Sequence, residues 1–137
     1  MAVRYLLDTN TVSYVIKGNI PRVRERLVKL PMADVAISVV TEAELRFGVA
    51  RKPGAVSLKR IVEEFLRHVE VLSWDSEAAH QYARVRAALE GDGQTLGNLD
   101  LMIAAHALAV KAVLVTQDSG FRRVKGLKTE DWALNIL

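Results

Sequence analysis

The chain has 137 residues, half of them hydrophobic, which is enough for one domain with a substantial core. It contains no cysteine, so disulfides, thiolate metal sites and cysteine nucleophiles are excluded. The net charge of +3 is compatible with an anionic partner without requiring one. We find no apolar stretch approaching ~18 residues and no secretory signal pattern, and therefore expect one cytoplasmic domain over residues 1–137, away from membranes.

Short apolar runs of strand length alternate along the chain with segments of helical length. In chain order, strands are expected near residues 4–7, 35–38, 69–72, 112–116 and 129–132. Helices are expected near residues 11–16, 21–29, 41–50, 55–67, 76–90 and 99–110. This alternation predicts an α/β fold in three layers, α/β/α, with a central, mostly parallel sheet of four to five strands.

Four carboxylates occupy the positions where open parallel sheets bind ligands. Asp8 and Asp118 follow the first and fourth strands, Glu42 lies in the first turn after the second strand, and Asp100 opens the last helix. Each has a structural explanation, as a favourable charge at a helix start or as a turn residue. Four acids at one edge would repel one another, however, and a hard divalent cation relieves that repulsion. The pattern predicts a site for one or two Mg²⁺ or Mn²⁺ ions.

Neutral polar side chains accompany these acids. Asn10, Thr41 and Thr116 are candidates for binding a metal-bound water or orienting a carboxylate. Thr11 could do the same, or could cap a helix.

The helix at 41–50 carries two further charged residues. Glu44 lies about 200° around the helix from Glu42, so it is not expected to be a second ligand on the same face. Arg46, four residues after Glu42, shares its face, where pairing with Glu42 is favoured over contact with a substrate phosphate.

A basic run follows Asp118. We expect Arg122, Arg123 and Lys125 to lie at the rim of the acidic cleft, where they can bind a polyanion that the acids repel.

Histidines and tryptophans show no pattern that indicates chemistry. His68, His80 and His106 share no ligand spacing, so packing or surface positions are expected. Trp74 and Trp132 are expected to pack beside strand ends, Trp132 being the better candidate for stacking on a base.

Four motifs in order resemble a known family. They read LLDTNTVSYVIKG, ISVVTEAELRFGVAR, GNLDLMIAAHAL and VLVTQDSGFRRVKGLKTEDW. Together they resemble the PIN-domain ribonucleases, specifically the VapC-type toxins of bacterial toxin–antitoxin pairs, over nearly the whole chain.

The resemblance implies a function and a set of acids. The family's acids match Asp8, Glu42, Asp100 and Asp118, and they imply Mg²⁺- or Mn²⁺-dependent cleavage of RNA by an activated water. The resemblance also implies a toxin homodimer and a VapB-like antitoxin whose C-terminal segment blocks the site. We expect the antitoxin helix to use a groove formed by the amphipathic helices at 55–67 and 76–90. The ending VKGLKTEDW is most similar to the subgroup that cuts initiator tRNA in the anticodon loop.

Two positions depart from the family pattern. Gly120 stands before Phe121 where many members have an acid, which makes Asp118 the least certain ligand. Asn98 stands where a proline is common, and it is expected to cap the helix that carries Asp100.

Two other functions remain open. A Mg²⁺-dependent phosphatase or receiver-like phosphoacceptor also places Asp after strands, but this chain has Asn10 where haloacid-dehalogenase-like phosphatases have a second Asp. A catalytically silent RNA- or protein-binding module gains nothing from four clustered acids.

Overall fold

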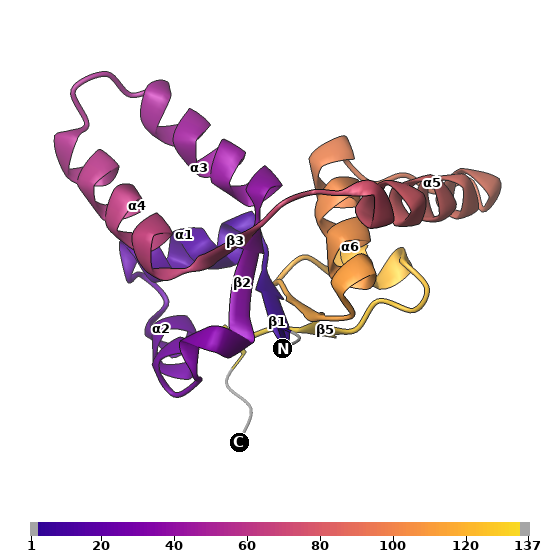
Figure 1. Cartoon of the computed structure of the whole chain (residues 1–137), viewed down its shortest axis with the longest axis horizontal. Helices are drawn as coiled ribbons and strands as arrows, with labels where there is room; N and C mark the ends of the chain where they lie inside the picture. Colours follow the sequence, from indigo (N-terminus) through magenta and orange to yellow (C-terminus); the bar gives the residue numbers. More distant parts are fainter. Residues whose placement is uncertain (1–2, 135–137) are drawn as a thin grey trace.

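The computed structural model describes residues 3–134. Within them, five strands alternate with six α-helices and two short 3₁₀ helices, η1 and η2 (Figure 1). The first half contains β1 (Tyr5–Leu7), α1 (Thr9–Lys17), α2 (Pro21–Val28), η1 (Met32–Asp34), β2 (Val35–Ser38), α3 (Val39–Ala50) and α4 (Val56–His68). The second half contains β3 (Glu70–Leu72), α5 (Ser76–Gly91), α6 (Asn98–Val110), β4 (Val113–Val115), η2 (Ser119–Arg123) and β5 (Thr129–Glu130).

The strands form one parallel sheet between two helical layers. Its order is β3-β2-β1-β4-β5, and every neighbouring pair is parallel. Successive residues of a strand face opposite sides, so Leu6 and Leu114 pack with α5 and α6, whereas Leu7 and Val115 pack with α1, α2, α3 and α4. Figure 1 shows these two groups of helices on either side of the sheet. The predicted three-layer α/β/α fold with a parallel sheet is confirmed.

The strand order creates a crevice at the middle of the sheet. The chain runs outward from β1 to β2 and β3, then crosses back to place β4 on the other side of β1. Leu7 pairs with Val115 at the carboxyl ends of β1 and β4, and connections leave this point in opposite directions. Open α/β sheets bind ligands at such a reversal. The residues after Leu7 and Val115 are therefore the first to consider as a site.

Most element boundaries lie within two residues of those predicted, and two helix starts require correction. Helix α1 begins at Thr9, with Asp8 as its N-cap, so Thr11 lies inside the first turn and caps nothing. Helix α6 has Gly97 as its N-cap and Asn98 as its first residue, so the predicted cap at Asn98 is wrong. Within residues 3–134, no helix is long and apolar enough to cross a membrane.

Candidate active site

Asp8 is a buried carboxylate at the carboxyl end of β1. Only 4% of the residue is exposed, and one carboxylate oxygen accepts a hydrogen bond from the backbone N–H of Thr11 at 2.8 Å. Burial raises the pKa of Asp8 above its ordinary value, and the charge of Asp118 raises it further, whereas hydrogen bonds from Thr116 and Thr11 act in the opposite direction. Asp8 is therefore rigidly held and costly to ionise without a cation.

Asp118 approaches Asp8 from the end of β4, and Thr116 links the two. The Thr116 hydroxyl accepts a hydrogen bond from the Asp118 N–H at 3.0 Å and is placed to donate to the Asp8 carboxylate. The Asp118 carboxylate in turn accepts from the Gly120 N–H at 2.8 Å. A Cβ at Gly120 would lie 3.1 Å from the Asp118 carboxylate oxygen. Glycine at this position therefore leaves room for the carboxylate to approach the Gly120 N–H. The departure at Gly120 thus accompanies a well-positioned Asp118.

Asp100 is close enough to three other acids for their charges to affect its pKa. It lies in the first turn of α6 and is partly buried. Burial raises the pKa of Asp100, and the negative charges of Asp118, Glu44 and Asp8 raise it further, in that order. Four carboxylates from β1, α3, α6 and the β4 end therefore act on one another.

The acid that α3 contributes to this cluster is Glu44. Its carboxylate accepts a hydrogen bond from the Thr9 hydroxyl at 2.5 Å, and Thr9 also contacts the Thr41 hydroxyl at 3.2 Å. Glu42 instead accepts from Arg46 at 2.7 Å, and it is not among the charges that shift the pKa of Asp100. The two glutamates lie on different faces of the helix, and the charge that acts on Asp100 is that of Glu44 and not of the predicted Glu42.

Helical spacing in α3 indicates that Glu44, and not Glu42, lies on the buried side of the helix. Val40, Thr41 and Leu45 are buried, and the helical spacing places Glu44 on the same side as these residues. Glu42 and Arg46, four residues apart, form the kind of pair that exposed helix faces carry. The Glu42–Arg46 pair therefore marked the outer face of α3.

The remaining polar candidates divide into two kinds. Thr41 is fully buried and supports Glu44 through Thr9, and Thr116 joins Asp8 to Asp118. Asn10 is exposed on the first turn of α1, and no hydrogen bond joins it to an acid among the described residues.

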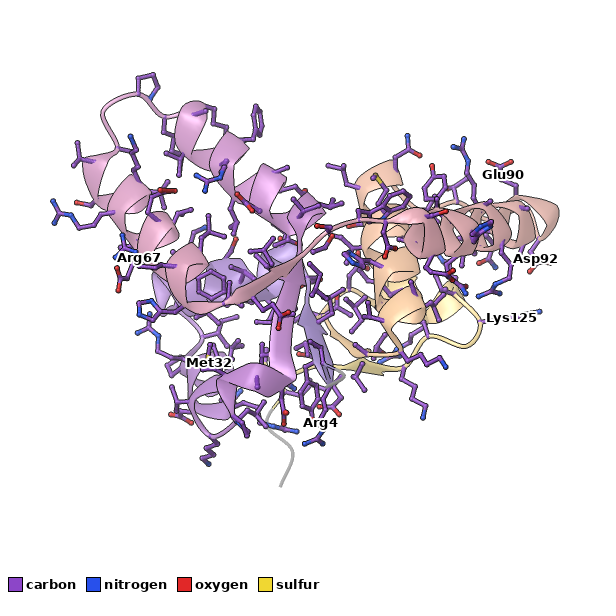
Figure 2. All side chains as sticks on the ribbon, in the orientation of Figure 1. Arg4, Met32, Arg67, Glu90, Asp92 and Lys125 are labelled. Carbon is purple, nitrogen blue, oxygen red and sulfur yellow. The ribbon has the colours of Figure 1, made fainter. Side chains whose placement is uncertain are left out.

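The basic candidates do not lie together. Arg46 bridges Glu42 and Glu63, at 2.7 and 2.6 Å, which agrees with the pairing favoured from the sequence. Arg122 lines a cavity that also contains Asp118. Arg123 donates to the Thr95 carbonyl at 3.1 Å and, with Lys125, lines a different small cavity against α5. Figure 2 shows Lys125 near Asp92, at the outer end of α5.

The histidines and tryptophans take structural positions, as expected. His106 is buried and bonds Ser38 at 2.7 Å between ring Nδ1 and the hydroxyl oxygen, whereas His68 and His80 are exposed. Trp74 donates to the Met102 carbonyl at 2.9 Å. Trp132 is buried edge-on against Tyr5.

The donor set suits a hard divalent cation, although its atoms are not gathered around one point. Within residues 3–134, no three acidic or histidine side chains lie close enough together to hold a metal ion as they stand. The neighbouring acids nevertheless raise the pKa of Asp8 and of Asp100, and Asp8 is buried without a cationic partner among the described residues. Carboxylate oxygens are the ligands that Mg²⁺ and Mn²⁺ prefer, so the chemistry of the cluster fits such an ion.

An apolar groove opens beside the acids on the α3 side. It has a volume of about 520 Å³, is lined by α1, α3, α4 and the first turn of α6, and includes Thr9 and Glu44. Phe47 and Leu99 contribute exposed apolar side chains to it, with 64% and 47% of each residue accessible. Helix α5 packs on α6 across the sheet, so the expected groove between the helices at 55–67 and 76–90 is wrong: α4 pairs with α3 and α1 instead.

Comparisons with known proteins identify the family of the chain. Residues 5–127 match the model of the PIN domain family. The chain is 36% identical over 131 residues to the tRNA(fMet)-specific endonuclease VapC of Shigella flexneri, covering 95% of this chain and 98% of that protein. It is 33% identical over 130 residues to Ribonuclease VapC2 of Rickettsia felis, covering 93% and 97%.

Solved structures lead to the same family. The chain superposes on DNA-bound VapBC from Salmonella typhimurium with a TM-score of 0.89 and 35% identity, covering 95% of this chain and 98% of that one. VapBC-1 from nontypeable Haemophilus influenzae gives a TM-score of 0.85 and 32% identity, covering 96% and 100%. With a matched family model, full-length relatives and a shared fold, the chain belongs to the PIN-domain family, among the VapC ribonucleases.

Proposed function

We propose that the chain is a toxin of the VapC type, a metal-dependent endoribonuclease whose acidic site consists of Asp8, Glu44, Asp100 and Asp118. The observation that carries this proposal is the meeting of acids at the carboxyl ends of β1 and β4, where Thr116 joins Asp8 to Asp118 and the first turn of α6 supplies Asp100. A relative named as a tRNA(fMet)-specific endonuclease supports initiator tRNA as the substrate, with the anticodon loop as the cleaved region. An unpaired loop suits a protein that must reach the RNA backbone, because A-form helices conceal their base edges.

Mg²⁺ or Mn²⁺, when bound, lowers the pKa of a water and stabilises the charge of phosphodiester displacement. The chain's own residues prepare the site for this chemistry. Asp8 is fixed by the end of β1 and by the Thr11 N–H, and Thr116 holds it in register with Asp118. The Thr9 hydroxyl fixes the orientation of Glu44. Ionic repulsion among the acids favours occupation by a cation over an empty site.

Glu44→Gln and Glu42→Gln form a matched pair that tests the acid assignment. We expect Glu44→Gln to lower the rate of Mg²⁺-dependent cleavage of initiator tRNA by about 100-fold or more, because it removes a charge that helps to hold the metal. Glu42→Gln should leave the rate nearly unchanged, because that carboxylate is paired with Arg46. The gain in melting temperature on adding Mn²⁺ should likewise shrink only in Glu44→Gln.

Four outcomes would contradict the proposal in different ways. Loss of cleavage in Glu42→Gln alone would restore Glu42 as the ligand. Undiminished cleavage by a variant that combines Asp8→Asn with Asp100→Asn would remove the acids from the chemistry. Hydrolysis of a generic phosphate ester with intact RNA would favour the phosphatase, and Mg²⁺-independent RNA binding without cleavage would favour the binding module.

We further propose that a VapB-like antitoxin helix occupies the apolar groove of α1, α3 and α4. Structures related to this chain were determined as VapBC assemblies, which supports such a partner. An amphipathic helix buries its apolar face in a groove of this kind, and this groove leads to Glu44. A basic residue of the partner reaching the acids would block the site by charge and by occlusion. A homodimer of the chain stays a prediction, which the mass of the purified protein in solution tests.

A further inference from the structure

A second cavity adjoins the acids and shares no lining residue with the apolar groove. It has a volume of about 350 Å³, within the range of roughly 300–1,000 Å³ typical of small-ligand sites. Thr116 and Asp118 line it, so it is continuous with the acidic cluster. Arg26 and Arg122 also line it, although they are distant in the sequence and belong to α2 and η2.

One wall of this cavity is a fixed aromatic and ionic stack. The Arg26 guanidinium lies over the Trp132 ring, 5.7 Å from its centroid, and is 3.3 Å from a Glu130 carboxylate oxygen. The same Glu130 oxygen accepts a hydrogen bond from the Trp132 indole N–H at 3.0 Å. Arg26 nevertheless keeps 48% of its side chain exposed. A guanidinium plane held in this way is a surface on which a nucleobase stacks.

The cavity is also lined by a guanidinium without a protein partner among the described residues. Arg122 is exposed, and among residues 3–134 no hydrogen bond or ion pair engages its side chain. It lies beside Asp118, whose carboxylate is already bonded to the Gly120 N–H. Guanidinium groups bind phosphate through paired N–H donors. The cavity therefore presents both a base platform and a phosphate donor next to the acids.

We propose that this cavity is a nucleotide subsite, which binds one unpaired nucleotide of the RNA next to the scissile phosphate. Arg122 binds the phosphate of that nucleotide, and the base stacks on Arg26 above Trp132. Gln117, exposed at the rim, offers amide donor and acceptor groups to the base edge. The inference rests on the proposed ribonuclease function and names where its substrate lies.

Binding of free nucleotides tests the subsite without requiring cleavage. The chain has two tryptophans, so Trp74→Phe leaves Trp132 as the only indole fluorophore, and it lies in the cavity. In this background, titration with AMP, GMP, CMP and UMP should give a saturable change in fluorescence. Adding Arg122→Ala should weaken that binding about tenfold, because a charge-assisted bond to phosphate is lost. Arg26→Met, which keeps the aliphatic stem, should weaken nucleotide binding more than binding of inorganic phosphate.

Arg123→Ala is the matched control, because Arg123 adjoins Arg122 in sequence but contacts the Thr95 carbonyl and the α5 side. It should change nucleotide affinity by less than about twofold. In cleavage of initiator tRNA, Arg122→Ala should raise KM about tenfold with little change in kcat, since it removes binding and leaves the acids intact.

Several results would overturn the subsite. The first is the absence of any change in Trp132 fluorescence with millimolar nucleotides. The second is a fluorescence change in Arg122→Ala equal to that of the parent protein. The third is a change with inorganic phosphate alone equal to that with nucleotides. Nucleotide binding combined with unchanged RNA kinetics in Arg122→Ala would place the cavity off the substrate path and overturn the assignment as well. Failure of the wild-type chain to cleave any RNA refutes the proposed function instead, and the fluorescence result still decides whether the cavity binds nucleotides.

Discussion

At the scale of single residues, Asp8 combines two roles that usually fall to different side chains. As the N-cap of α1, it accepts a hydrogen bond from the Thr11 N–H, and as a buried acid it contributes negative charge to the site. The first role needs only an acceptor oxygen, whereas the second needs an ionised carboxylate. Asparagine preserves the first and removes the second, so the two roles can be separated by substitution.

Asp8→Asn should stabilise the metal-free protein at pH 7 and abolish cleavage. The pKa of Asp8 is raised above 3.8, so the folded protein binds its proton more tightly than the unfolded chain. The free energy of unfolding therefore falls as pH rises from 3.8 through the raised pKa, and the variant escapes that loss. Denaturant unfolding in EDTA at pH 4 and pH 7 measures the free energy of unfolding of both proteins. The excess of Asp8→Asn over wild type should be larger at pH 7.

Asp8→Ala is the control, because it loses the cap as well and should cost about 1 kcal/mol relative to Asp8→Asn. If both variants were equally destabilised at both pH values, the charge of Asp8 would have no part in the stability of the fold.

At the scale of elements, the rotation of α3 about its axis selects which glutamate enters the site. Val40 and Leu45 face the two cores of the protein, yet Val39 and Phe47 of the same helix remain 39% and 64% exposed. Because apolar residues occur on several sides, hydrophobic periodicity alone does not determine the phase of this helix. Packing between α6, α4 and the sheet resolves that ambiguity and turns Glu44 toward Asp100.

The buried contact between His106 and Ser38 connects the helices that carry Asp100 and Glu44. His106 belongs to α6, and Ser38 caps α3 by accepting from the Val40 N–H. Burial lowers the pKa of His106, against the opposing effects of the Asp75 charge and the Ser73 backbone. The ring is therefore neutral in the folded protein near pH 7 and resists protonation.

His106→Asn should lower the free energy of unfolding by about 1–3 kcal/mol at pH 7, since it shortens a buried, hydrogen-bonded side chain. The lowered pKa means that the unfolded chain binds this proton more tightly, so wild-type stability falls as pH drops below 6.5. The difference between wild type and variant should therefore shrink between pH 7 and pH 5 in urea unfolding.

The exposed His80, on α5, supplies the matched control. His80→Asn should change stability by less than about 0.5 kcal/mol. A pH-independent difference for His106→Asn would show that His106 stabilises the fold without a linked protonation.

At the scale of the whole molecule, the acids lie between two unlike surfaces. The apolar groove includes Thr9 and Glu44, whereas the polar cavity includes Thr116 and Asp118, and the two have no lining residue in common. A protein partner and an RNA substrate can therefore approach the same carboxylates from different directions.

Phe47→Asp should weaken antitoxin binding about 100-fold or more, because it places a charge in the apolar groove. Co-expression with a VapB-like antitoxin, sought as a small open reading frame immediately upstream, followed by native mass spectrometry, measures the complex. Val28→Asp is the control, since Val28 is 74% exposed on α2 and does not line the groove. Equal complex formation by both variants would place the antitoxin elsewhere, while cleavage of RNA by free Phe47→Asp should persist.

The central strands, three of the four acids and the family follow from the order of residues in the sequence. Runs such as Tyr5–Leu7 and Val113–Val115 are apolar at every position, which indicates central strands covered on both faces, and polar residues directly after them indicate ligand positions. Asp8, Asp100 and Asp118 could be chosen in this way because a strand end or first helical turn defines where each side chain points. The motif order also indicated the family, which the comparisons confirm.

Other features depend on distances that residue order does not contain. The sequence places Glu42 and Glu44 two positions apart and pairs Glu42 with Arg46 by helical spacing, but the packing of α3 decides which face of the helix meets Asp100. Arg122 and Arg123 are neighbours, yet η2 directs one to the acidic side and the other to α5. Arg26 reaches the Asp118 cavity from α2, across most of the chain. Local patterns specify strands, helix ends and the acids attached to them, whereas the faces that helices present and the partners they meet arise from long-range packing.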